Sequence, residues 1–213
     1  ERANEMKNRF LSNMSHAIRV PLNGVLGFSQ IIANEVEIDE PTRKEYADII
    51  QQNTEQLMRL VNNVLDLSRL EAGMMKFQLS DYDIVQLCKD SVGMAQMQNP
   101  TLHIHFYSDI DEYIVYTDTN RMMQLIVSIL TCPSPSFKEE HDLQFTLDKN
   151  GEILCFKVTN SPLADLNYAN QDSALRNDVN LLLLKHFGGT YQVIHDGKEG
   201  PTILFTYPAT STE

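Results

Sequence analysis

The sequence predicts an α + α/β protein, with an N-terminal antiparallel helical hairpin followed by an α/β sandwich that has a mixed sheet. Apolar residues recur at steps of three and four from residue 1 to about 73, which is the period of a helix. From about residue 78 the period changes to two, in short runs separated by helical segments. A polar break, ANEVEIDE, divides the first half at residues 33–40. We therefore expect two domains, residues 1–75 and residues 76–213.

The second predicted helix has a regular apolar seam. Pro41 follows two acidic residues and suits a helix start, while Gly73 suits a helix end. With Asn53 between them, the seam residues are spaced by alternating steps of four and three: Tyr46, Ile50, Leu57, Leu60, Val64 and Leu67. A two-helix hairpin cannot bury all of its apolar residues, so we expect this seam to join two copies into a homodimeric four-helix bundle. A coiled-coil spacer without chemistry would show the same pattern.

The second half alternates short strands with helices. Strands are predicted at LHIHFYS, DEYIVYTD, LQFTLDKN, ILCFKVTN and TILFTYPA. Helices are predicted at NRMMQLIVSIL, which Asp118 caps, at DVNLLLLKHF, and after a cap near Ser80 or Asp81. This mixture indicates helices packed on one face of a mixed sheet.

Charge and composition exclude several classes of function. The net charge of −12 argues against a nucleic-acid partner and against direct contact with an anionic membrane. Cys88, Cys132 and Cys155 lie far apart and indicate a reducing compartment without a disulfide framework. His103 and His105 share a strand face but lack a third ligand nearby, so we expect no metal site. Because the chain opens within a helical pattern, we expect a cytoplasmic piece of a larger and possibly membrane-anchored sensor.

The stretch SHAIRVPLN combines an outward histidine with a proline inside a helix. On a helical wheel, His16 lies about 160° from Met14, so it points away from the apolar stripe of the helix. Pro21 removes a backbone donor and suggests a bend below the imidazole. Neutral imidazole is a good nucleophile near neutral pH. The pattern therefore indicates a helix that presents a nucleophilic ring to solvent.

These residues resemble a known family. FLSNMSHAIRVPLNGVLGFSQII is similar to the H-box of two-component sensor histidine kinases, and QQNTEQLMRLVNNVLDLSRLEAG resembles the second helix of their dimerisation and phosphotransfer domain. YTDTNRMMQLIVSIL and the closing HFGGTYQVIHDGKEGPTILFTYPA resemble segments of their catalytic ATP-binding domain. The resemblance implies that His16 accepts a phosphoryl group, that Arg19 supports it, and that the partner is a response-regulator receiver domain.

The chain departs from this family at positions that the family uses for catalysis and for nucleotide binding. Ala17 replaces the acidic residue that follows the family's histidine, and Val20 replaces a Thr or Asn that positions water. Ser128 and Cys132 stand where the family has the asparagines that hold Mg²⁺ and phosphates, and Asn160 stands where it has an adenine-binding aspartate. Residues 172–177 replace a glycine-rich loop. ATP and Mg²⁺ are thus expected as cofactors only if these degenerate positions still bind them.

Three functions remain open at this point. The first is a degenerate histidine-kinase core, a pseudokinase, that exchanges phosphoryl groups between His16 and a receiver aspartate. The second is an authentic but slow sensor kinase. The third is a non-enzymatic signalling scaffold. Ala17 and Val20 favour the third over the second, and the retained SH-IR-PL frame favours the first over the third.

Overall fold

The computed structural model describes the backbone of residues 2–34, 37–131, 140–167, 171–195 and 198–209. Within these ranges it describes side chains from residue 17 onward, except those of residues 171 and 172. The chain divides into two compact units, Glu1–Ser68 and Arg69–Glu213. Each unit is described by itself below.

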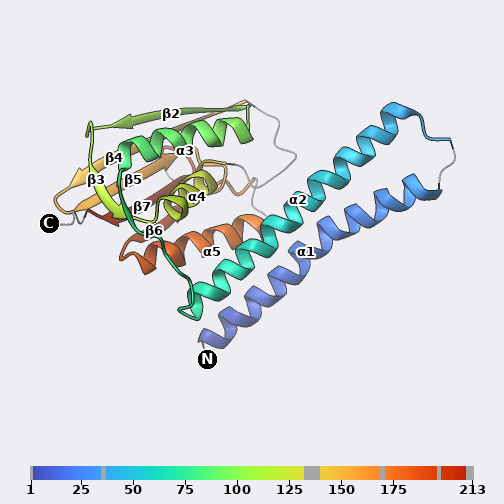
Figure 1. Cartoon of the computed structure of the whole chain (residues 1–213), viewed down its shortest axis with the longest axis horizontal. Helices are drawn as coiled ribbons and strands as arrows, with labels where there is room; N and C mark the ends of the chain where they lie inside the picture. Colours follow the sequence, from blue (N-terminus) through green and yellow to red (C-terminus); the bar gives the residue numbers. More distant parts are fainter. Residues whose placement is uncertain (1, 35–36, 132–139, 168–170, 196–197, 210–213) are drawn as a thin grey trace. The chain divides into compact units, whose positions relative to one another are not determined.

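The first unit is a hairpin of two long helices, α1 (Arg2–Asn34) and α2 (Glu40–Glu71), as Figure 1 shows. The side chain of Asp39 accepts a hydrogen bond from the Thr42 amide at 3.1 Å, as expected of a cap. The hydrogen bonds of Thr42, first that of its side chain and then that of its amide, hold the pKa of Asp39 below its ordinary value. The start that Pro41 predicts is confirmed, because α2 begins at Glu40.

The seam of α2 faces α1 within the hairpin. Leu60 and Leu67 are buried, the other four predicted seam residues are half-buried, and the rings of Phe28 and Tyr46 lie 5.3 Å apart. A second apolar row lies one position along and is exposed: Met58, Val61 and Leu65. In a single chain the predicted seam therefore packs mostly inside the hairpin, and the second row carries most of the apolar surface that α2 leaves uncovered.

The second unit contains two sheets. A five-stranded mixed sheet has the order β2-β4-β5-β7-β6, in which β2 and β4 are parallel and the other pairs antiparallel. Its strands are β2 (Leu102–Ser108), β4 (His141–Asn150), β5 (Ile153–Thr159), β6 (Thr190–Ile194) and β7 (Thr202–Pro208). A two-stranded antiparallel sheet joins β1 (Ser80–Asp83) to β3 (Ile114–Thr117). The predicted fold class is confirmed.

Three helices accompany the large sheet: α3 (Ile84–Gln98), α4 (Thr119–Leu130) and α5 (Gln171–His186) (Figure 1). Alternate side chains of β4, such as Phe145, join the buried residues of these helices in one apolar core. The opposite face of the sheet carries exposed residues, including His103 and Gln144. The helices therefore pack on one face, as predicted.

The structure corrects one predicted cap and confirms another. Asp83, and not Ser80 or Asp81, caps α3, since its carboxylate accepts from the Val85 and Gln86 amides. Residues 80–83 pair with β3 instead, which keeps Ser80 in a strand. Asp118 caps α4 as predicted, by accepting from the Arg121 amide at 3.1 Å. No helix in the described part of the chain is long and apolar enough to cross a membrane.

Candidate functional site

Helix α1 passes through position 16 and continues without interruption through Pro21. The side chain of His16 lies outside the described part of the structure. The helical period places position 16 on the same face as Arg19, Val20 and Asn23, whose side chains are all exposed. The face of α1 that contains the predicted phospho-acceptor is therefore open to solvent over the next two turns.

Ala17, about 100° further around the helix, belongs to its inward side. It is only 8% exposed, whereas Val20 is 57% exposed. The side chain of Asn53 lies against Gly24, and moving two turns from that contact along each helix brings Ala17 opposite the buried Leu60. The residue after His16 therefore lies in the hairpin interior, where an ionised carboxylate would be costly.

The degenerate nucleotide positions lie in the second unit. Ser128 is on α4, half-buried, and its hydroxyl lies 2.9 Å from the Leu125 carbonyl and 2.9 Å from Oδ1 of Asn180 on α5. Cys132 lies outside the described residues. The hydroxyl of Ser128 therefore already has partners within the protein.

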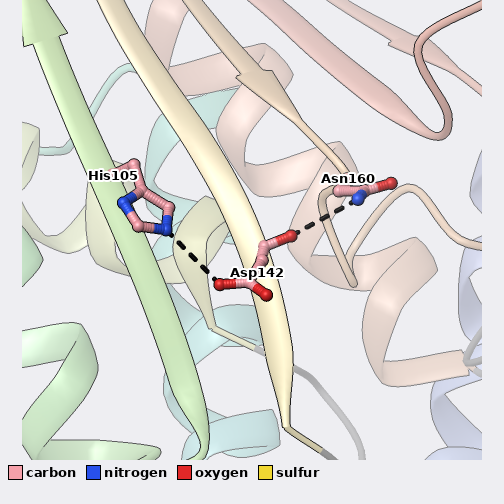
Figure 2. A network of polar contacts seen from close by, with 3 residues as sticks. All are labelled: His105, Asp142 and Asn160. Carbon is pink, nitrogen blue, oxygen red and sulfur yellow. Dashed lines mark hydrogen bonds and ion pairs between the residues drawn. The ribbon is translucent and has the colours of Figure 1, made fainter.

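Asn160 directs its side chain toward the sheet. Its φ angle is +59°, and Nδ2 donates to the Asp142 carbonyl at 3.3 Å (Figure 2). The Asn160 carbonyl in turn lies 2.6 Å from Nε2 of His141. Figure 2 also shows His105 beside the Asp142 carboxylate, at 3.3 Å. The structure thus ties Asn160 to β4, and does not bring it together with Ser128.

The residues that follow Asn160 point into the interior of the second unit. Ser161 is fully buried, and its hydroxyl donates to the Ile129 carbonyl of α4 at 3.1 Å. Leu163 and Ala164 belong to the apolar core of the unit. The segment that follows β5 is therefore a buried turn packed against α4.

Sequence reasoning missed two polar residues of this region, Ser161 and Asn180. Both are buried and both reach α4, through the Ile129 carbonyl and the Ser128 side chain respectively. A signal existed for Asn180, because it lies one turn before Leu184 on a strongly apolar helix face. Ser161 lacked such a signal, since the direction of a loop side chain depends on tertiary contacts.

The paired histidines of β2 do not form a metal centre with their neighbours. His105 meets only the carboxylate of Asp142, and both side chains are more than half exposed. Across the described ranges, no group of three or more His, Cys, Asp or Glu residues could hold a metal ion.

Comparison with known families identifies the first unit. Residues 6–73 match the His Kinase A (phospho-acceptor) domain. The chain is also 33% identical, over 135 residues that make up 62% of its length, to hybrid signal transduction histidine kinase G of Dictyostelium discoideum. The chain spans only 4, 19 and 26% of the length of three curated relatives that it matches.

Solved structures show the same fold. The histidine kinase AdeS of Acinetobacter baumannii superposes with a TM-score of 0.70 at 16% identity, covering 92% of this chain and 98% of its own. The histidine kinase ThkA, solved in complex with the response regulator protein TrrA, superposes with a TM-score of 0.65 at 15% identity. That match covers 97% of this chain and 61% of ThkA.

Proposed function

The chain belongs to the histidine kinase family of two-component signalling, and we propose that it exchanges phosphoryl groups between His16 and a response-regulator aspartate, with weak or absent ATP-dependent autokinase activity. The observation that carries this proposal is a difference in exposure between two neighbouring positions of α1. The face that contains position 16 is exposed, while the position of the family's acidic helper is a buried alanine.

Phosphoryl exchange requires little from this chain beyond the imidazole ring of His16. A ring nitrogen attacks the phosphorus of an aspartyl phosphate, the N–P bond forms, and the P–O bond to the aspartate breaks. The aspartate leaves as a carboxylate, and the second ring nitrogen releases its proton to water. Arg19, one turn from His16 and exposed, is suited to pair with the transferred phosphoryl oxygens.

Autophosphorylation lacks its helpers. A positioned acid or base typically contributes about 10²–10⁴-fold to a proton-linked step, and Ala17 supplies none. Val20 bears on dephosphorylation instead, since its side chain has no polar atom to position the hydrolytic water of the phosphatase reaction. An incoming receiver domain can bring its own groups to the reaction, which is why exchange with a receiver suits this site better than self-phosphorylation.

The degenerate positions do not fit Mg²⁺ and ATP. Ser128 and Ser161 use their hydroxyls on carbonyls or side chains of the chain itself. Asn160 points its amide at β4 and presents no carboxylate for adenine. Binding of ATP and Mg²⁺ would require these contacts to break. The residues that replace the family's ligands would supply few groups to coordinate Mg²⁺ or the nucleotide.

We also propose that the active form is a homodimer through the helical hairpin. The exposed row of Met58, Val61 and Leu65 on α2 is matched by exposed Leu22 and Leu26 on α1. Burial of such rows against a second copy would complete a four-helix bundle. Sedimentation of the full chain tests this, with a dimer expected for the wild type and a monomer for Val61→Glu.

The experiment that tests the function uses a receiver domain carrying labelled aspartyl phosphate. We expect acid-labile label on the wild-type chain, none on His16→Gln, and about tenfold slower transfer to Arg19→Ala, because a charge-assisted hydrogen bond contributes about 1.5–3 kcal/mol. Arg43→Ala, which removes an exposed arginine of α2, is the control. A chain that takes up no label from any receiver while still dimerising would instead support the non-enzymatic scaffold.

A further inference from the structure

Polar side chains of α4 and α5 meet at the degenerate nucleotide positions. Ser128 Oγ lies 2.9 Å from the Asn180 amide. One turn further along α4 and one turn back along α5, a guanidinium nitrogen of Arg176 donates to Thr131 Oγ1 at 3.4 Å. Contacts in this order show that the two helices run in opposite directions where their side chains meet. The two helices are thus tied at two successive turns.

The first tie joins a hydroxyl to a buried amide. Ser128 has one hydroxyl proton and two acceptors within reach, the Leu125 carbonyl and Asn180 Oδ1. Asn180 is only 3% exposed, and its amide also lies beside the Tyr191 hydroxyl. The Asn180 side chain is therefore enclosed between α4 and β6.

The second tie involves Thr131, the residue that follows the last residue of α4. Thr131 Oγ1 accepts from Arg176 and donates to the Val127 carbonyl at 2.8 Å, and the residue is buried. In both ties, a hydroxyl at the C-terminal end of α4 lies within hydrogen-bonding distance of a side chain of α5. The two hydroxyls therefore join the helices.

A third bond holds α5 to the sheet. The hydroxyl of Tyr191, on β6, donates to Asn177 Oδ1 at 2.6 Å. Burial raises the pKa of Tyr191, and this effect exceeds the lowering by the neighbouring Asn180 amide. The hydroxyl therefore stays protonated and keeps its donor role at neutral pH.

We propose that these bonds form a clasp, defined as Ser128–Asn180, Thr131–Arg176 and Asn177–Tyr191, which fixes α5 against α4 and β6 without any ligand. Three residues of the clasp, Ser128, Arg176 and Asn177, stand at positions where the family's resemblance places nucleotide-binding residues. It makes the second unit a permanently assembled body, in keeping with a docking role. This inference rests on the proposed loss of ATP binding and names the contacts that take the place of the ligand.

Hydrogen–deuterium exchange of the full chain tests the clasp. Ser128→Ala and Asn180→Leu should each raise the exchange rates of α5 amides at least tenfold. The double variant should exchange no faster than the faster single variant, because both remove the same bond. Asn120→Leu, which removes an exposed amide from α4, is the matched control and should leave α5 unchanged. Millimolar Mg·ATP should leave the exchange of wild-type α5 unchanged.

Two results would overturn the clasp. One is unchanged α5 exchange in both single variants, or additive effects in the double variant. The other is slower α5 exchange in the wild type with Mg·ATP. A loss of protection of the β4 and β5 amides would show that Asn180→Leu unfolds the second unit. In that case the exchange of α5 in Ser128→Ala alone decides whether the clasp exists. Loss of label transfer to His16 with α5 still protected would contradict the proposed function and leave the clasp standing.

Discussion

Gly24 of α1 lies directly against the side chain of Asn53 of α2. A Cβ atom at Gly24 would meet Asn53 Oδ1 at 2.8 Å and Cγ at 2.9 Å. The Asn53 side chain is itself held in place, because Nδ2 donates to the Ile49 carbonyl at 2.8 Å. At this point the two helices of the hairpin approach so closely that a side chain at position 24 would meet Asn53.

The two glycines of α1 should therefore respond differently to alanine. Gly27 has no atom within 4 Å of a built Cβ, so Gly27→Ala should stabilise the hairpin by about 0.5–1 kcal/mol through helix propensity. Gly24→Ala should lose this gain, because Asn53 must move. Thermal unfolding followed by circular dichroism measures both, and equal gains at the two positions would show that the contact does not constrain the helices.

Restoring an acidic residue after His16 should destabilise the protein. Ala17→Glu places a carboxylate in the hairpin interior, at an expected cost of about 1–3 kcal/mol. Val20→Glu, one turn along on the exposed face, should cost little. Denaturant unfolding compares the two variants. Label uptake from γ-labelled ATP should not rise in Ala17→Glu, and a clear rise would show that the missing acid alone limits autophosphorylation.

Asn160→Asp, the change toward the family's residue, should not create a nucleotide ligand. The new carboxylate oxygen would face the Asp142 carbonyl, so an attractive contact would become a repulsive one. We expect a loss of about 0.5–1.5 kcal/mol. Asn160→Gly, which accepts the φ of +59° without the amide, separates backbone from side-chain effects. Calorimetry should detect no ATP binding by Asn160→Asp, and measurable binding would contradict the observed orientation.

The carboxyl of Asp148 gives a pH-dependent prediction. Partial desolvation, and then the charge and hydrogen bond of Asp109, raise its pKa above the ordinary value of 3.8, against a smaller lowering by Lys157. The folded state therefore binds this proton more tightly than the unfolded state does, and the associated stability is lost as the pH rises through the folded pKa. Asp148→Asn should be more stable than the wild type at pH 7, and the difference should vanish below about pH 3.8.

Unfolding at several pH values checks this prediction. Asp111→Asn, which makes the same change in net charge at another exposed carboxyl, is the control. A gain for Asp148→Asn that persists unchanged at low pH would point to a cause other than its ionisation.

The sequence anticipated elements whose signals are local. The spacing of α2 marked its buried side, which was expected to join a second copy and which in a single chain packs on α1. Asp118 was recognisable as a cap. The inward side of α1 was less visible, because Ala17, Pro21 and Gly24 are too small or too unusual to form an apolar stripe. Leu22, an apolar residue four positions after Ile18 and so in line with it on the helix, is exposed.

In the candidate site too, features set by local sequence could be predicted, and features set by distant residues could not. Position 16 and its neighbours could be found from sequence because a helix fixes which residues share a face. Helix α1 continues through Pro21, although the Ala17 carbonyl loses its usual donor, and the bend expected there stays a prediction. The orientation of Asn160 could not be predicted, because its positive φ depends on Asp142 and His141, both distant in sequence.

The most direct test of phosphoryl exchange compares two labelling reactions on one preparation of the full chain. One uses γ-labelled ATP with Mg²⁺, and the other uses a receiver domain carrying labelled aspartyl phosphate, with the phosphorylated residue mapped by mass spectrometry. We expect label on His16 from the receiver domain and little or none from ATP. Rapid labelling of His16 from ATP, or receiver-derived label that persists in His16→Gln, would contradict the proposed function.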